Sequence, residues 1–270
     1  MANQTLAEKT EALANKATQK AKEEPKQLPI WAEDFRSAPN EVIRSSLFSA
    51  RIRGEREYLT DAVVFVLGDG EITYRGEELR TFDEDVWLQV MHLARLQPLG
   101  ECVQFTPYSM IKALGWVKGK TRPSKLHYER LKECLSRLKA TALTVKSKRM
   151  GVGVSVSLIR KFEFNDENDN WKVWIEREMK TLYGDTYYTQ LEWEQRAQLS
   201  PVAKRLHSYF ASHQAPYPVK IENLYQLCNL RLAIKHFRVK LKGYLTELVE
   251  IGFLESFSIE DTKVLVKRVS

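Results

Sequence analysis

The sequence has 270 residues, 43% of them hydrophobic and 29% charged, and a formal net charge of +7 at pH 7. These values describe an ordinary globular protein that can bury a sizeable core and has room for two small domains. The longest apolar run, residues 62–67, is too short to span a bilayer, and the N-terminus lacks the apolar core of a signal peptide. We therefore expect a cytoplasmic protein that makes no contact with a membrane.

The N-terminal stretch and the segment after it differ in composition. Residues 2–26 consist almost entirely of Ala, Lys, Glu, Thr and Gln, which predicts disorder or a fraying helix. An apolar segment, QLPIW, follows at residues 27–31. It either anchors the tail on the first domain or forms a linear peptide in which Leu28, Ile30 and Trp31 fill a hydrophobic pocket of a partner.

From residue 37 onward the chain alternates strand and helix patterns. The turn sequence Gly68-Asp69-Gly70 predicts a hairpin, and apolar positions spaced as on one helical face begin at Asp83. Three acidic residues occupy the first turn of that helix, where the helix dipole favours them. The predicted elements are an irregular stretch with a helical turn at 37–53, strands at 61–67 and 71–74, a helix from 83, a strand at 102–105, helices at 107–114 and 124–140, and strands at 141–148, 152–164 and 171–177.

The C-terminal part predicts a helix–turn–helix followed by a hairpin. Its long helix is expected to end at Gly252, because a residue without Cβ suits a left-handed cap. A helix–turn–helix followed by a hairpin is typical of a winged helix, whose long helix enters the DNA major groove. The predicted elements are a helix closing at 206–213, an extended piece at 217–221, helices at 222–228 and 231–251, and hairpin strands at 253–259 and 262–269.

The order helix, turn, helix, hairpin occurs twice, from about Asp83 and from about Thr189. We therefore predict an α+β protein with two tandem winged-helix domains. The expected division of the chain is a flexible tail with the apolar peptide at 1–36, a first winged-helix domain at 37–186 and a second at 187–270.

Basic residues concentrate in the second predicted domain. Between residues 200 and 245 there are eight Lys and Arg and one acidic residue, so this span carries +7 (eight minus one). A cationic helical face is the expected footprint of phosphate binding, although an ordinary solvated face is the alternative. The candidate DNA-binding residues are Arg231, Lys235, His236, Arg238, Val239 and Lys242 on the long helix and Lys263, Lys267 and Arg268 in the hairpin.

The long helix of the first domain carries two further candidates, Lys125 and Arg130. Glu129 and Glu133 are interleaved with its basic residues and nearly balance their charge. We therefore expect this domain to contact the DNA backbone or to mediate self-association, while the second domain reads bases.

The sequence offers no catalytic or metal-binding motif. Residues 115–121 resemble a phosphate-binding loop, but Leu114 stands where glycine is required and no parallel strand precedes it. The five histidines include no close pair, and the three widely spaced cysteines lie in apolar patterns, which favours buried thiols over a disulfide or a zinc site. We expect no enzymatic activity, no metal and no cofactor.

Three blocks carry a family resemblance: ITYRGEELR with the acidic run and VW after it (72–87), ECLSRLKATA (133–142) and LSPVAKRLHSYFASHQAPYPVKIE (199–222). Through them the chain resembles the TrfA family of plasmid replication initiators from Gln27 onward. The resemblance implies two winged-helix domains that bind tandem repeats, called iterons, at a plasmid origin and open an adjacent AT-rich stretch. The implied partners are double-stranded origin DNA, single-stranded AT-rich DNA, the host initiator ATPase DnaA, the replicative helicase and a second copy of the chain in a monomer–dimer equilibrium.

The same family carries a QLSLF-like peptide that binds the bacterial sliding clamp. Gln27, Leu28 and the pair Ile30-Trp31 match its pattern, while Pro29 replaces the serine and Trp31 the phenylalanine. The resemblance therefore favours a clamp-binding role for these residues over an anchoring one.

Two other functions fit parts of the sequence. A winged-helix transcriptional repressor would share the fold and the charge, but it would need no clamp peptide and would not melt DNA. A rolling-circle nickase would use a tyrosine such as Tyr187 or Tyr188 beside a metal-binding histidine pair, which the sequence lacks.

Overall fold

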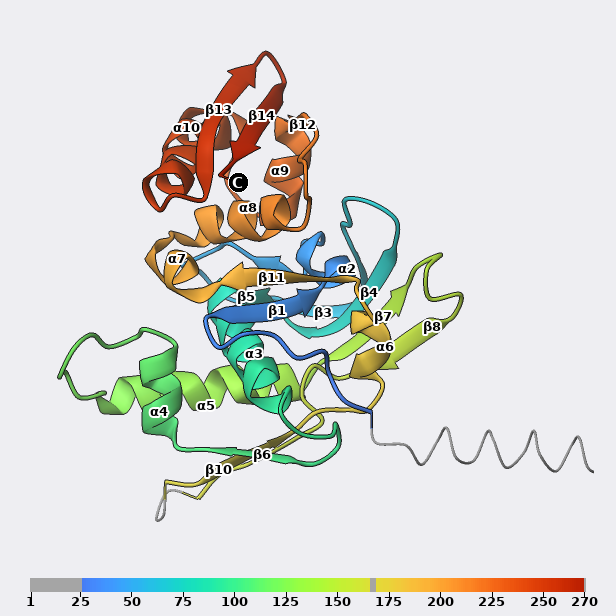
Figure 1. Cartoon of the computed structure of the whole chain (residues 1–270), viewed down its shortest axis with the longest axis vertical. Coiled ribbons are helices and arrows are strands. Elements are labelled where there is room, and N and C mark those ends of the chain that lie inside the picture. The colour runs from blue at the N-terminus through green and yellow to red at the C-terminus, as the bar shows by residue number, and fades with distance from the viewer. Residues whose placement is uncertain (1–25, 166–168, 270) are drawn as a thin grey trace, which may run out of the picture.

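The computed structural model describes residues 26–165 and 169–269, which build a mixed α/β molecule (Figure 1). The segment 2–26, for which disorder or a fraying helix is predicted, lies outside the described residues apart from Lys26. In the two described ranges, no helix is both long and apolar enough to cross a membrane.

The elements are labelled as in Figure 1. The helices are α2 (Asn40–Ile43), α3 (Thr81–Ala94), α4 (Pro107–Ala113), α5 (Lys125–Lys139), α6 (Met179–Tyr183), α7 (Trp193–Gln198), α8 (Pro201–Ala211), α9 (Ile221–Cys228) and α10 (Ile234–Glu250). The strands are β1 (Phe35–Pro39), β2 (Phe48–Ser49), β3 (Tyr58–Val64), β4 (Glu71–Glu77), β5 (Leu79–Arg80), β6 (Cys102–Phe105), β7 (Ala142–Lys146), β8 (Gly153–Val156), β9 (Lys161–Glu163), β10 (Trp171–Trp174), β11 (Tyr188–Glu192), β12 (Val219–Lys220), β13 (Leu254–Glu260) and β14 (Lys263–Arg268).

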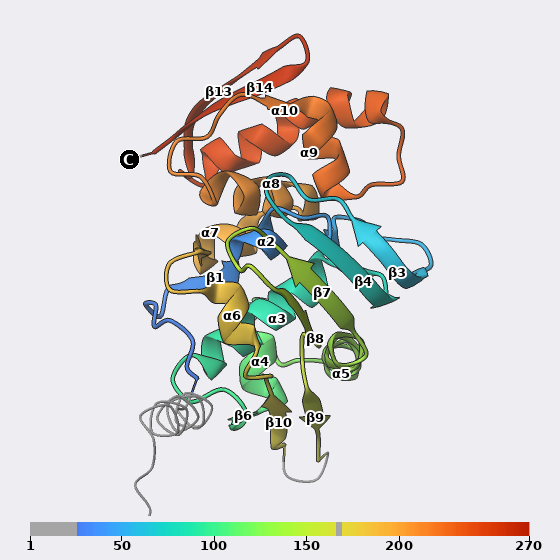
Figure 2. The same cartoon turned by 90° about the vertical axis from the view of Figure 1, so that its right-hand side faces the viewer.

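The buried apolar residues form two clusters. The first extends from Leu28 to Leu191 and surrounds α3, whose Trp87, Leu88 and Val90 are fully buried. The second is built by α8, α9, α10 and the C-terminal hairpin, and it also includes Ala50 from the N-terminal part. We call the parts of the chain around these clusters the first and the second unit. In Figures 1 and 2, α8 lies at their junction.

The two units repeat one order of elements. In the first, α3, β6, α4, α5, β9 and β10 occur in this order, with β7 and β8 inserted between α5 and β9, and β6, β9 and β10 form an antiparallel sheet in the order β6-β10-β9. The second unit has the corresponding order of elements, α8, β12, α9, α10, β13 and β14. Its three strands form an antiparallel sheet in the order β12-β14-β13. The predicted repeat of helix, turn, helix and hairpin is therefore present at the level of elements.

One strand prediction in the first unit is wrong. Residues 152–164 do not form a single strand but divide into β8 and β9, because the intervening Leu158 and Ile159 turn into the core and are fully buried. The hairpin β7-β8 does not stand free after α5. It completes a four-stranded sheet, β3-β4-β7-β8, beside α5 (Figure 2).

Residues 37–53 are more ordered than predicted, because strands from distant parts of the chain pair with them. β1 pairs with β11 in an antiparallel register from Phe35↔Glu192 to Pro39↔Tyr188, and β2 pairs in parallel with β5. The sequence-based division assigns β11 to the second domain at 187–270, but its Leu191 is buried in the first cluster.

The segment at 26–36 is packed against the first unit, so its predicted flexibility is wrong for these described residues. Leu28 and Trp31 are 3% and 4% exposed, and both belong to the first cluster. The Trp31 ring stacks on Tyr183, with ring centroids 6.0 Å apart, and its Nε1 donates to Nδ1 of His92 over 3.2 Å. Trp31 thus ties this segment to α3 and α6.

Candidate nucleic-acid interface

The helix α10 divides into a buried face and a cationic face. Phe237, Leu241, Leu245 and Leu248 are fully buried and pack in the second cluster, as their three- and four-residue spacing predicts. The helix ends at Glu250 with Ile251 as its cap residue, and Gly252 follows with φ of +73°, which confirms the predicted glycine cap. The opposite face is thereby fixed toward solvent.

That opposite face carries charges without partners. Lys235, His236, Arg238, Lys240 and Lys242 are exposed, and none of their side chains makes an ion pair with another described residue. Val239, in the middle of this set, is 81% exposed. A rigid helix that presents unpaired cations around an exposed aliphatic side chain can meet phosphates and base edges together.

The turn that leads into α10 is held by the first unit. Asn229 ends α9 in the left-handed conformation, with φ of +47°, and its carbonyl accepts a hydrogen bond from Oγ of Ser49 over 2.9 Å. The Ala50 amide donates to the Cys228 carbonyl over 2.9 Å. Residues around β2 therefore set the orientation of α10 relative to the first unit.

Arg231 is not part of the cationic helical face, contrary to the prediction. The helix begins only at Ile234, and Arg231 lies in the preceding turn, where it forms an ion pair with Glu57 of the first unit. An acid distant in sequence thus pairs with one of the expected DNA-binding residues, whose side chain is still 50% exposed.

The expected charge excess of this region is smaller in the structure. Arg205 is fully buried against Glu84, with Nη1 2.7 Å from the carboxylate, and Nζ of Lys204 lies 2.6 Å from Asp85. With Arg231 paired as well, five of the eight basic residues remain (eight minus three): Lys220, Lys235, Arg238, Lys240 and Lys242. All five are exposed.

The hairpin residues differ in availability. Lys263 is exposed and lies opposite Lys220 in the β12-β14 register, so the two cations are neighbours in the sheet. Lys267 is exposed but pairs with Glu255 across the hairpin over 2.8 Å. Arg268 is partly buried: its guanidinium lies over the Phe253 ring and donates to the His213 carbonyl over 2.9 Å, so it is engaged within the protein.

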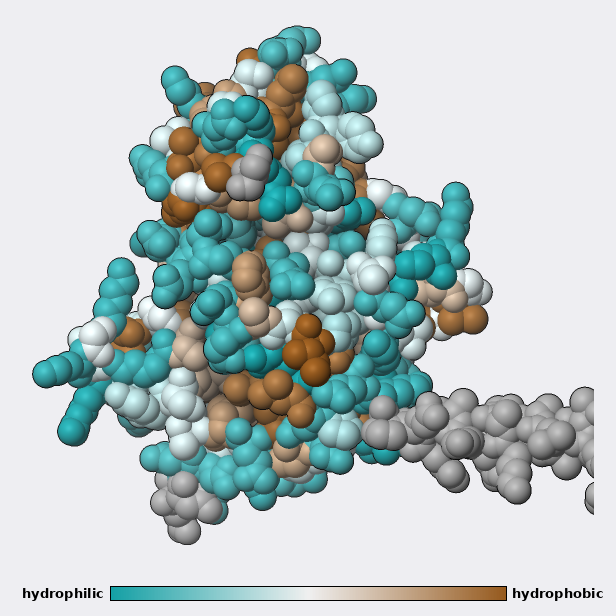
Figure 3. All heavy atoms as spheres, in the orientation of Figure 1, coloured by the Kyte–Doolittle hydropathy of each residue, from teal (hydrophilic) through white to brown (hydrophobic). Residues whose placement is uncertain are grey.

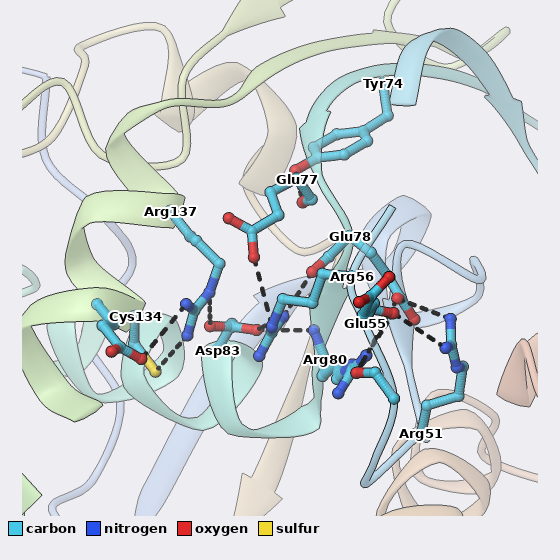
Figure 4. Close-up of polar contacts among 12 residues, drawn as sticks. Arg51, Glu55, Arg56, Tyr74, Glu77, Glu78, Arg80, Asp83, Cys134 and Arg137 are labelled. Carbon is cyan, nitrogen blue, oxygen red and sulfur yellow. Dashed lines mark hydrogen bonds and ion pairs between the residues drawn. The ribbon is translucent and has the colours of Figure 1, made fainter. Parts of the chain in front are cut away.

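The cations of α5 are largely engaged within the first unit. Arg137 donates from Nε to buried Asp83 over 3.0 Å, and Arg56 binds the same carboxylate over 2.8 Å (Figure 4). Lys125 lies 3.6 Å from Glu129, and the Arg130 guanidinium lies over the rings of Phe82 and Trp116. Lys125 and Arg130 are both exposed, and α5 carries five Lys and Arg against two Glu, an excess of three, of which Arg137 is bound to Asp83.

Two candidates are added by the structure. Lys240 lies on the exposed face of α10, and Lys220 lies beside Lys263 on β12. Both are part of the basic excess in the sequence. Lys240 directly follows Val239 on α10, whereas only the fold brings Lys220 next to Lys263. Among residues 26–165 and 169–269, no group of three or more His, Cys, Asp or Glu side chains is arranged to hold a metal ion.

The QLPIW segment is only partly exposed to solvent. Ile30 is 70% exposed, whereas Gln27 donates from Nε2 to the Arg95 carbonyl over 3.1 Å. With Leu28 and Trp31 in the core, the four candidate clamp-binding residues do not form one accessible peptide in this arrangement.

Comparisons with known proteins agree on one family. The family described as TrfA protein matches residues 1–268. The plasmid replication initiator protein TrfA of Escherichia coli is 37% identical over 246 residues, which are 88% of this chain and 63% of that protein. The chain thus spans less than two thirds of the length of this curated relative.

The fold has relatives among solved structures. A crystal structure of domains 2 and 3 of RctB superposes with a TM-score of 0.54 at 14% identity, covering 85% of this chain and 96% of that one. A second structure of the same RctB domains gives a TM-score of 0.55 at 12% identity, covering 84% and 94%. At such identities the likeness concerns the fold alone.

Proposed function

This chain belongs to the TrfA family, and on that premise we propose that it is a replication initiator that binds duplex DNA at a plasmid origin. The proposal extends to this chain the role of its Escherichia coli relative, of whose length the chain spans 63%. The observation that carries it is the exposed face of α10, where Lys235, Arg238 and Lys242 have no ion-pair partner among the described residues.

We assign a winged helix to each unit. The repeated sheet orders β6-β10-β9 and β12-β14-β13, each with a helix pair between its first two strands in sequence, support this assignment. In the second unit α10 would be the helix that enters the major groove, and the β13-β14 hairpin would be the wing. The helix α5, whose Arg137 and Arg130 are engaged within the first unit, suits a supporting role on the DNA.

The finer steps of initiation belong to the same proposal. They are recognition of iterons, opening of an adjacent AT-rich stretch, recruitment of DnaA and the replicative helicase, and exchange between dimers and monomers. The protein would act by binding, without catalysis of its own, and in the cytoplasm, because plasmid DNA is found there. The sliding clamp is a partner only in a state in which residues 27–31 leave the first cluster, since Leu28 and Trp31 are buried there.

The test begins with selection of duplexes that the protein retains from a randomised pool. Replacing Arg238 by Ala should weaken binding to the selected duplex by about 1–3 kcal/mol if its guanidinium pairs with a guanine edge, and should weaken binding to random duplexes much less. Arg160→Ala is the matched control, because Arg160 is exposed and its side chain has no partner among the described residues. Equal losses on both duplexes would reduce Arg238 to a phosphate contact, and failure to select any sequence would contradict the proposed function.

Initiation and repression are separated by a second measurement. An initiator bound to a plasmid origin should make thymines in the neighbouring AT-rich stretch reactive to permanganate. A repressor bound to the same duplex would leave those thymines paired.

A further inference from the structure

The connection between α4 and α5 is cationic over an unusually long span. From Cys102 to Tyr128 the sequence has five basic residues, Lys112, Lys118, Lys120, Arg122 and Lys125, and no acidic one. Lys118, Lys120 and Arg122 lie in the connection itself, are exposed, and make no ion pair with another described residue. Three unpaired cations within five residues repel one another in the free protein, so an anionic partner would be favoured there.

The connection is shaped by contacts at its base. Val117 is 8% exposed and belongs to the first cluster, against which Trp116 also packs. Nζ of Lys112, on α4, donates to the carbonyls of Gly119 over 2.6 Å and Thr121 over 3.0 Å. These contacts hold the backbone of the connection against α4, and the neighbouring cations are exposed to solvent.

This surface lies on the same side of the molecule as α10. In Figure 1 the α4–α5 connection projects to the left, the side on which α10 also lies, and Figure 3 shows hydrophilic side chains projecting there. The adjacent helix α5 has fewer cations free to bind an anion, since Arg137 is bound to Asp83 and Arg130 lies over aromatic rings. The free charge of the first unit on this side is therefore in the connection before α5.

We propose that Lys118, Lys120 and Arg122 bind the sugar-phosphate backbone of duplex DNA beside the segment that α10 reads. The inference rests on the proposed function and names a contact surface outside the two long helices. Phosphates are the partner favoured by this chemistry, because the three side chains supply only cationic donors on a loop, with no helix or strand to enter a groove. Such a contact would fix the register of the first unit on DNA without reading sequence.

The test compares two triple variants that lose the same charge. The connection variant, Lys118→Ala/Lys120→Ala/Arg122→Ala, removes the proposed contacts. The control triple, Lys139→Ala/Lys148→Ala/Arg160→Ala, removes three exposed cations whose side chains have no partner among the described residues. The probe is a 30-bp duplex of mixed sequence, titrated at several salt concentrations. Each lost phosphate contact lowers the slope of log K against log salt by about 0.9, so the first variant should lose about 2–3 in slope and the control almost nothing.

The outcomes separate this inference from the function on which it rests. A third variant, Lys235→Ala/Arg238→Ala/Lys242→Ala, should flatten the slope if α10 binds DNA. If it does so while the connection variant behaves like wild type, the connection is not a DNA contact and only the inference fails. An equal effect of the control triple would also overturn the inference, because net charge alone would then explain the loss. If the wild-type protein binds no duplex, both proposals fail.

A footprint gives an independent measure. On the selected duplex, the connection variant should lose hydroxyl-radical protection on one flank and keep it where α10 binds. Unchanged protection on both flanks would overturn the inference even if affinity fell.

Discussion

At the scale of single residues, the structure makes His207 a source of acid sensitivity. Its ring is 1% exposed, packs against Phe253 with centroids 4.3 Å apart, and leaves Nδ1 without a hydrogen-bond partner among the described residues. Burial, helped by the charges of Arg196 and Arg268, lowers the pKa of His207 to about 3. The buried imidazole is therefore neutral at pH 7.

The sign of the effect follows from linkage. The pKa is lower in the folded state than the ordinary value of 6.5, so the unfolded chain binds the proton first and stability falls as pH drops from 6.5 toward 3. Between pH 7.5 and pH 5 the loss from this one group should be on the order of 2 kcal/mol. Urea unfolding of wild type and His207→Phe at both pH values measures it, and the variant should lose less stability on acidification. The same loss in both proteins would show that His207 is not the responsible group.

Two basic residues of the C-terminal hairpin should behave in opposite ways. Arg268 donates to the His213 carbonyl and lies over Phe253, so Arg268→Ala should cost roughly 1–2 kcal/mol of folding stability and leave the salt slope of DNA binding unchanged. Lys263 is exposed, and Lys263→Ala should leave stability unchanged and lower the slope by about one if the hairpin contacts phosphate. Denaturation and salt titration of both variants test the pair, and a slope change in Arg268→Ala alone would reverse the assignment.

At the scale of elements, the segment 27–31 should contribute to the stability of the first unit. Leu28 and Trp31 are almost fully buried, and each truncation to Ala removes apolar contacts and leaves a cavity. Leu28→Ala/Trp31→Ala should lower the free energy of unfolding by several kcal/mol, since single truncations of this kind cost about 2–5 kcal/mol. Ile30→Ala is the control, because Ile30 is 70% exposed and its loss should be close to neutral. A double variant as stable as wild type would mean that the segment is detached in solution and free to bind a clamp.

Local patterns predicted the helices better than the strand pairings. The face of α10 and its end at Gly252 follow from three- and four-residue spacing and a glycine, both of which are visible in one stretch of chain. The pairing of β1 with β11 joins residues far apart in sequence, so no local pattern contains it. Separation along the chain also explains why the sequence does not predict the ion pair of Arg231 with Glu57, whose position beside it is set only by the fold.

At the scale of the whole molecule, a buried ionic cluster joins the two units. Glu84 and Asp85 of α3 belong to the first unit, and they bind Lys204 and Arg205 of α8, in the second unit, over 2.6 and 2.7 Å. They also bind Arg196 of the intervening helix α7 over 2.8–2.9 Å. Burial alone would raise the pKa of Asp85, but Lys204 and Arg196 outweigh it and lower that pKa. The acidic first turn of α3, which the sequence explains by the helix dipole, is thus mainly a contact between units.

Removing one member of this cluster should loosen the second unit from the first. In Glu84→Ala the fully buried Arg205 loses the carboxylate 2.7 Å from its Nη1, and an uncompensated buried charge costs about 3–5 kcal/mol. Glu133→Ala is the control, because that carboxylate is 67% exposed, lies 3.8 Å from Arg137, and should contribute less than about 1 kcal/mol.

The distribution of tryptophan allows the two units to be followed separately. All six tryptophans lie between Trp31 and Trp193, and the second cluster contains none, so fluorescence reports the first unit while far-UV circular dichroism reports both. In wild type and Glu133→Ala the two signals should change together as urea is added. In Glu84→Ala the dichroism should begin to fall at a lower urea concentration than the fluorescence, because the second unit then unfolds first. Coincident transitions in Glu84→Ala would mean that the backbone contacts around Ser49 and Ala50 couple the units without the ionic cluster.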